Sequence, residues 1–195
     1  MSKLFQRGNH KLPREIAIFN LPHLITCPGA TAECRQYCYA RKAESQYPHS
    51  LPYRYKNWEA SKRLDFVGFA IVELSHMRTV RAVRIHESGD FYNQEYLDKW
   101  VEIAKAMPNL IFTAYTKSLH LDFSKFRKLP NTVLFASIDP TTPKWMLEKN
   151  KIKAKATVIP KDAKVPTGYF DCPGSCKVCT HCYTRPARSV AFHKH

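Results

Sequence analysis

The chain has 195 residues, and its 31 Lys and Arg against 16 Asp and Glu give a formal net charge of +15. A hydrophobic content of 44% excludes a disordered polycation, and the longest apolar stretch, Phe66 to Val72, is far too short to cross a bilayer. The first residues contain no apolar segment typical of a secretory signal, so we expect a cytoplasmic protein without disulfides and without a membrane partner.

The first 80 residues are predicted to hold one strand, a cysteine-rich loop and one long helix. Residues 15–20 fit a strand that leads the chain to Cys27. Residues 58–77 fit a long helix, because apolar side chains recur along one face at helical spacing. These side chains are Leu64, Val67, Ile71 and Leu74.

Residues 81–160 alternate between strand-like and helix-like segments. Strands recurring about every 20–28 residues, with helices between them, are typical of β-α units. With the first strand, the pattern predicts one α/β domain, either a partial β/α barrel or an open parallel sheet of about five strands. Residues 161–195 remain as a cysteine-rich loop and a basic tail. Strands are expected at 82–86, 110–115, 132–138 and 152–159, and helices at 93–107, 122–129 and 142–150.

The seven cysteines form two groups, with none between residues 38 and 172. The first group has the spacing C-x6-C-x3-C and the second C-x3-C-x2-C-x2-C. Each group opens with Cys-Pro-Gly and closes with Cys-Tyr-x-Arg, so we expect both loops to turn similarly beside a bound inorganic centre. The members are Cys27, Cys34 and Cys38 in the first group, and Cys172, Cys176, Cys179 and Cys182 in the second.

We interpret the second group as a closed iron–sulfur site. Four-cysteine zinc sites commonly use two close cysteine pairs separated by a long loop. Three short gaps are instead typical of the dense loops that hold a 4Fe-4S cluster. Zinc is the alternative metal for these four thiolates.

The first group has only three cysteines, and three thiolates on a 4Fe-4S cluster leave one iron open to a small molecule. One alternative is a 3Fe-4S cluster, which needs only three ligands. Another is a fourth ligand from His23, His86, Asp90 or a cysteine of the second group. Because two such centres in one chain could pass electrons, the sequence also suggests an electron carrier with an acidic protein partner or an electron-donor protein.

Several chemically active residues follow the predicted strands directly. Sites in parallel α/β folds lie at the carboxyl ends of strands, so these residues and both cysteine groups are predicted to meet at one rim of the sheet. The residues are Glu87, Ser88, Gly89, Asp90, Lys117 and Asp139.

A three-cysteine loop after the first strand of a partial barrel resembles the radical S-adenosylmethionine (SAM) superfamily. Tyr37 stands just before Cys38, as an aromatic residue does in that superfamily, although the usual spacing there is C-x3-C-x2-C. The resemblance implies SAM bound to the open iron, with its amino group held by the loop Glu87-Ser88-Gly89-Asp90. Lys117 is a further candidate for contacting SAM or a substrate.

Longer strings resemble a family of phage and prophage proteins, the gene product 88 family. They are CPGATAEC-x3-CYA, VRIHESGDFY, FTAYTKS and CPGSC-x2-C-x2-CY, and they occur in that order along the chain. The resemblance implies a phage or prophage protein that acts in the cytoplasm of the bacterial host.

The excess of positive charge suggests a polyanionic partner, DNA or RNA. Basic residues interleaved with Tyr and Trp between residues 39 and 58 suit a single strand, whose phosphates take the charge while its bases stack on the rings. The alternatives are an ordinary solvated basic face and compensation for negatively charged clusters. The candidate nucleic-acid-binding residues are Arg41, Lys42, Arg54, Lys56, Lys62, Arg63, Arg185 and Arg188.

Overall fold

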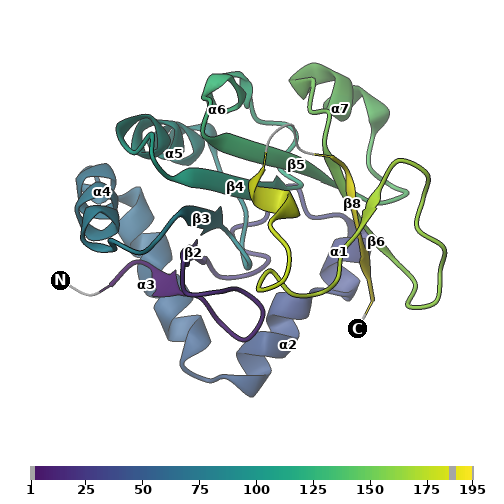
Figure 1. The fold of residues 1–195 in the computed structure, drawn as a ribbon, viewed down its shortest axis with the longest axis horizontal. Helices are drawn as coiled ribbons and strands as arrows, with labels where there is room; N and C mark the ends of the chain where they lie inside the picture. Colours follow the sequence, from purple (N-terminus) through teal and green to yellow (C-terminus); the bar gives the residue numbers. More distant parts are fainter. Residues whose placement is uncertain (1–2, 185–187, 195) are drawn as a thin grey trace.

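The computed structural model describes residues 3–184 and 188–194, which form a mixed α/β fold around an open sheet (Figure 1). The strand order is β1-β2-β3-β4-β5-β6-β8-β7, and every neighbouring pair is parallel except β1 with β2. The strands are β1 (Gln6–Arg7), β2 (Ile16–Phe19), β3 (Ala82–Ile85), β4 (Ile111–Thr116), β5 (Thr132–Ile138), β6 (Lys155–Ile159), β7 (Phe170–Asp171) and β8 (Val190–His193).

The sheet is open, mostly parallel and not closed into a barrel, so the predicted α/β fold class is confirmed. The five expected strands are β2 to β6, in sequence order across the sheet. The structure adds β1, β7 and β8, which sequence patterns missed. The first two are only two residues long, and β8 lies in the segment predicted as a basic tail. There it continues the sheet between β6 and β7, with Val190 and Ala191 fully buried.

The helices largely follow the predicted pattern after residue 90, and they differ before it. The single helix predicted for 58–77 is wrong, because the chain bends at Arg63, whose backbone is extended. Arg63 pairs with Asp65 at this corner, and Leu64 is 97% exposed rather than packed on a helix face. The helices are α1 (Ala32–Gln36), α2 (Tyr39–Gln46), α3 (Ser50–Lys62), α4 (Phe66–His76), α5 (Gln94–Ala106), α6 (Ser124–Lys128), α7 (Lys144–Asn150) and the 3-10 turn η1 (His181–Tyr183).

The main core lies between one face of the sheet and helices α4, α5 and α6. Side chains alternate across a strand, so Val83 and Ile85 of β3 enter this core while Arg84 points to the opposite face. Trp100 of α5 is fully buried at the centre of an aromatic cluster. Its ring neighbours are Phe5, Phe19, Phe66, Tyr96 and Phe112.

The four-cysteine loop covers the opposite face of the sheet. Figure 1 shows η1 lying across β4, and Thr113 of β4 donates a hydrogen bond to the carbonyl of Cys182 (2.9 Å). Cys172 and Cys182 pack against an apolar cluster built on β5, β6 and β8. The prediction that both cysteine groups meet at one rim is therefore wrong for the second group, because β8 returns into the sheet after the loop and draws it over this face.

Candidate functional site

The first cysteine group lies at the carboxyl ends of the strands, as predicted. The Cys27 amide donates to Leu24 O (3.0 Å), and Thr31 caps helix α1 by accepting from the Cys34 amide (3.2 Å). Cys38 is the residue just before helix α2. The charges of Cys34 and Cys38 both act on Cys27, so the turns of this segment bring the three thiols into one neighbourhood.

Lys117 and Asp139 anchor that segment to the ends of β4 and β5. Asp139 accepts from the Thr31 hydroxyl (2.6 Å) and from Lys117 Nζ (2.6 Å). A Cβ placed on Gly29 would lie 2.1 Å from the carbonyl oxygen of Lys117, so the loop sits directly on the backbone there. Burial would raise the pKa of Asp139, but the hydrogen bonds from Lys117, Thr141 and Thr31 outweigh it and hold that pKa well below its usual range.

The Glu87-Ser88-Gly89-Asp90 loop is bound within the protein on both sides. The Asn20 side-chain oxygen accepts from the amides of Glu87 (2.7 Å) and Ser88 (3.0 Å), and the Ser88 hydroxyl donates to Leu21 O (2.9 Å). Gly89 has φ +83°, and a Cβ there would lie 2.5 Å from the side chain of Leu21. The loop therefore positions the chain just before Cys27, and its predicted contact with SAM stays a prediction.

Asp90 connects this loop to β4. Its carboxylate accepts from the Thr116 hydroxyl (2.7 Å) and the Lys117 amide (2.8 Å). Burial raises its pKa to about 6 in spite of these hydrogen bonds. The same carboxylate acts on Cys27, and burial together with that charge raises the pKa of the Cys27 thiol to about 12. A metal at Cys27 must therefore displace a proton.

The three non-cysteine residues considered as a fourth ligand for the first group each have a partner already. His23 Nδ1 lies 2.5 Å from Glu44, and Asp90 is bound as described. His86, with φ +65°, is buried on the helix side of the sheet, where its Nε2 lies 2.8 Å from the Tyr96 hydroxyl. Burial, and then the charge of Arg84, lowers the His86 pKa to about 3.

The second group carries hydrogen-bond donors directed at its sulfurs. The Gly174 amide lies 3.4 Å from Cys172 Sγ, and the His181 amide lies 3.5 Å from Cys179 Sγ. Each amide belongs to the second residue after its cysteine. Such N–H···S contacts favour the thiolate that a metal requires, and they tune iron–sulfur clusters.

Two tyrosines reach the other two sulfurs of the group. Burial raises the pKa of Cys182 to about 11, and a hydrogen bond from Tyr115 and the charge of Arg84 oppose that rise. The buried Tyr183 hydroxyl makes no hydrogen bond of ordinary geometry among the described residues, yet it lies close enough to Cys176 to lower the pKa of that thiol. Three of the four thiols therefore accept a hydrogen bond, and the fourth, Cys176, lies close to the Tyr183 hydroxyl.

The thiols are gathered but not in ligating positions. All seven cysteines are free, and among residues 3–184 and 188–194 no three Cys, His, Asp or Glu side chains are close enough to hold a metal ion. A hollow of about 140 Å³ opens beside Cys172 and is lined by the loop and by β8. The donor chemistry of the loop fits a thiolate-bound metal, and binding would have to draw the four sulfurs together.

The predicted basic residues that the structure describes differ in exposure and in partners. Arg54 is buried and pairs with Glu44 (2.5 Å), so the prediction that it binds nucleic acid is wrong. Lys62 pairs with Glu59 and lies 3.8 Å from the centre of the Trp58 ring, and Arg63 pairs with Asp65 as described. Arg41, Lys42 and Arg188 are exposed, Lys56 is half-buried, and Arg185 lies outside the described residues.

Comparison with known proteins decides the family. A model of the family described as "Gene product 88" matches residues 3–171. The chain belongs to the gene product 88 family. The matched stretch holds the first cysteine group and ends one residue before Cys172.

Two curated relatives align with this chain over nearly equal lengths. The "Gene 88 protein" of Mycobacterium phage L5 is 28% identical over 127 residues, and that of Mycobacterium phage D29 is 29% identical over 128 residues. Each alignment covers 60% of this chain and 53% of the relative, so the chain spans about half the length of the curated relatives it matches.

No solved structure matches the chain. The comparisons give no support to the resemblance to the radical SAM superfamily. Within the part of the chain that the structure describes, no helix is long and apolar enough to span a membrane.

Proposed function

We propose that this gene product 88 protein is an iron–sulfur protein of a phage or prophage, with a closed 4Fe-4S cluster on the four-cysteine loop. The observation that carries the proposal is the set of donors at three of the four sulfurs, those of Cys172, Cys179 and Cys182. Two are backbone amides at 3.4 and 3.5 Å, and the third is the Tyr115 hydroxyl. Ordinary core cysteines would not need these donors.

Charge around the loop also supports an anionic centre there. A 4Fe-4S cluster with four thiolates carries about −2 in its oxidised form, and a nearby cation stabilises that charge. Arg84 lies near Cys176 and Cys182 and lowers the pKa of both thiols. When bound, the cluster would supply one-electron transfer, while the loop would hold it against β4 through Thr113 and Tyr115.

The three-cysteine group is proposed as a second, open centre. Its candidate ligands His23, His86 and Asp90 are each bound elsewhere, which leaves a cysteine of the second group or a small molecule to complete the site. Anaerobic addition of SAM to the reduced protein tests whether that molecule is SAM. A changed electron paramagnetic resonance (EPR) spectrum or release of 5′-deoxyadenosine would support it, and no change in either would refute it.

Matched cysteine variants test whether the two centres are separate. The protein is purified without oxygen, and visible absorption and EPR spectra are recorded for the wild type, Cys176→Ser and Cys34→Ser. We expect each variant to lose one part of the spectrum and keep the other. A colourless wild-type protein that holds zinc and lacks acid-labile sulfide would contradict the iron–sulfur proposal and favour a zinc-braced module.

Binding of single-stranded nucleic acid is a second candidate function, and exposed rings favour it. Tyr37, Tyr39 and Tyr47 expose 59%, 65% and 63% of their surface near the exposed Arg41 and Lys42. Stacking on such rings contributes about 1–3 kcal/mol per base. Fluorescence anisotropy with a labelled oligonucleotide should show binding that weakens steeply with salt. Binding that is absent at low salt would refute this candidate.

A further inference from the structure

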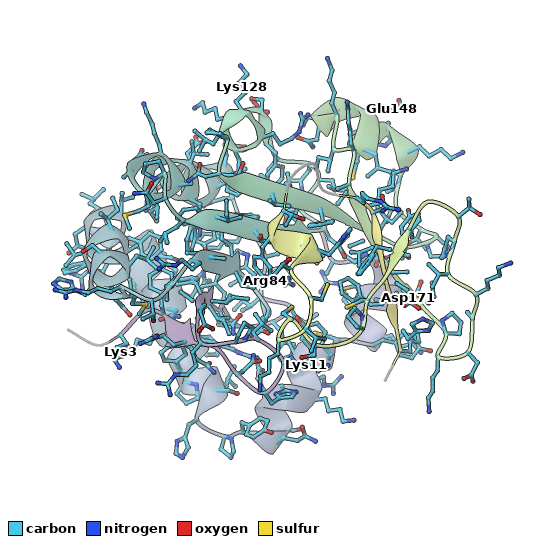
Figure 2. The ribbon with its side chains drawn as sticks, in the orientation of Figure 1. Lys3, Lys11, Arg84, Lys128, Glu148 and Asp171 are labelled. Carbon is cyan, nitrogen blue, oxygen red and sulfur yellow. The ribbon has the colours of Figure 1, made fainter. Side chains whose placement is uncertain are left out.

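Arg84 is a charged side chain on a strand whose other positions are buried and apolar. Figure 2 shows it near the middle of the molecule, next to the segment that contains η1 in this view. Its Nε donates to the His86 carbonyl (3.1 Å), and its guanidinium carbon lies 3.9 Å from the centre of the Tyr115 ring. A guanidinium that stacks on a ring keeps the N–H donors along its edge free to bind a group in the plane of the guanidinium.

That edge has no partner within the part of the chain that the structure describes. Among the described residues Arg84 makes no ion pair, and neither of its terminal nitrogens donates a hydrogen bond. The carboxylate that acts on it is that of Glu87, but both Glu87 oxygens accept from the Asn9 side chain (3.0 and 3.1 Å). The Glu87 carboxylate therefore acts on Arg84 without binding it, and the N–H donors of the two terminal nitrogens are free to bind an anion.

The two Cys-Tyr pairs of the cysteine groups lie around this guanidinium. Tyr39 follows Cys38, Tyr183 follows Cys182, and the charge of Arg84 acts on both phenols as well as on Tyr115. The Tyr183 hydroxyl is buried without a partner, while Tyr39 is 65% exposed. The site therefore has an unsatisfied hydroxyl on its inner side and an open side at Tyr39.

We propose that Arg84, with the hydroxyls of Tyr39 and Tyr183, binds an oxyanion between the two cysteine groups. Carboxylate and phosphate groups share the required chemistry, because each presents two oxygens that match the paired N–H donors of a guanidinium. The tyrosine hydroxyls can donate to the same group. Such a site would hold the charged end of a small molecule beside the thiols, and it does not depend on which metal the cysteines bind.

The experiment is a titration of the anaerobically purified protein with inorganic phosphate and, separately, with acetate at constant ionic strength. Binding is followed by the arginine Nε–Hε resonances and by the melting temperature. We expect one resonance to shift saturably and the protein to melt higher. Arg84→Gln should weaken binding at least tenfold, and Arg81→Gln, which changes an exposed arginine just before the same strand, should not weaken it.

Further ligands identify the molecule that carries the oxyanion, and further variants control for misfolding. A nucleoside monophosphate and a short single-stranded oligonucleotide distinguish a small molecule from a nucleic-acid backbone as the ligand. Tyr39→Phe removes only one hydroxyl from a residue that is 65% exposed, so we expect it to fold, and it should weaken phosphate binding several-fold. Circular dichroism checks that Arg84→Gln is folded, and Arg84→Lys, which keeps the charge but not the paired donors, replaces it if it is not.

Two results would overturn the proposal. One is an arginine spectrum that does not change with either anion up to about 50 mM, because a dissociation constant above that concentration is too weak for a specific site. The other is equal binding by the wild type and the Arg84 variants. If Arg84→Gln loses bound metal while the wild type binds no added oxyanion, Arg84 is only the counter-charge of a metal centre. The metal proposal would then stand, and the oxyanion site would be refuted.

Discussion

Gly29 and Gly174 occupy the same place in the two Cys-Pro-Gly motifs, but the structure requires glycine at each for a different reason. At Gly29 a Cβ would lie 2.1 Å from the Lys117 carbonyl oxygen and 2.8 Å from Ser118 Cα. Both atoms belong to the backbone at the end of β4, so rotation of a side chain cannot relieve the clash. At Gly174 a Cβ would meet nothing within 4 Å, and only the backbone φ of +79° disfavours a side chain.

Alanine at the two positions should therefore have unequal effects. Gly29→Ala must push the first cysteine loop off β4 by about 1 Å, and overpacking of this kind costs about 3 kcal/mol. For a chain of this length that lowers the melting temperature by roughly 10 °C. Gly174→Ala carries only the left-handed backbone penalty of about 1 kcal/mol, which corresponds to roughly 3 °C.

Thermal and urea unfolding of the two variants beside the wild type measure the difference. The two-state free energies of unfolding should rank Gly29→Ala well below Gly174→Ala. A Gly29→Ala protein that unfolds with the wild-type midpoint would refute the close approach between the loop and β4. It would also remove the structural argument that β4 positions the three thiols.

Three further outcomes follow from the same contacts. Trp100→Ala should cost about 4 kcal/mol of stability because its ring is fully buried, whereas Trp145→Ala, 57% exposed, should change urea unfolding by less than about 0.5 kcal/mol; equal effects would contradict the core. The chemical shift of the His86 ring should not change between pH 5 and 8, since its pKa is lowered to about 3. Only the unfolded chain takes up that proton near pH 6.5, so the stability that is present above about pH 6.5 is lost as the pH falls toward 3. A titration midpoint of the His86 ring near pH 6.5 in the folded protein would contradict this. Asp139→Asn should cost about 2 kcal/mol and speed proteolysis near Thr31, as it weakens two hydrogen bonds at 2.6 Å; unchanged proteolysis would contradict the anchoring role.

The parallel strands could be predicted because each is a short apolar run between helices with clear periodicity. Helix α5 is the plainest example, since its buried residues include Tyr96, Trp100 and Ile103 at helical spacing. Strand β8 could not be predicted, because three apolar residues in a basic tail form a strand only where β6 and β7 offer edges on either side. The break between α3 and α4 comes from the extended backbone at Arg63, and the spacing of apolar residues does not predict it.

The site divides in the same way. That Asp90, Lys117 and Asp139 lie near the first cysteine group follows from the parallel arrangement of strands, and sequence was sufficient for it. Arg84 was missed, since one polar residue in a strand is normally read as the solvent-facing position. The two Cys-Tyr pairs were visible as a repeated motif, but only the folded chain brings Tyr39 and Tyr183 to one guanidinium.

The central claim is that the four-cysteine loop holds an iron–sulfur cluster. Its most direct test is the iron, acid-labile sulfide and zinc content per chain of protein purified without oxygen. We expect iron and sulfide in a ratio of about one to one, at about four of each per closed cluster, with a loss of that amount in Cys176→Ser. Zinc without sulfide, or a Cys176→Ser protein with the full wild-type iron content, would contradict the claim.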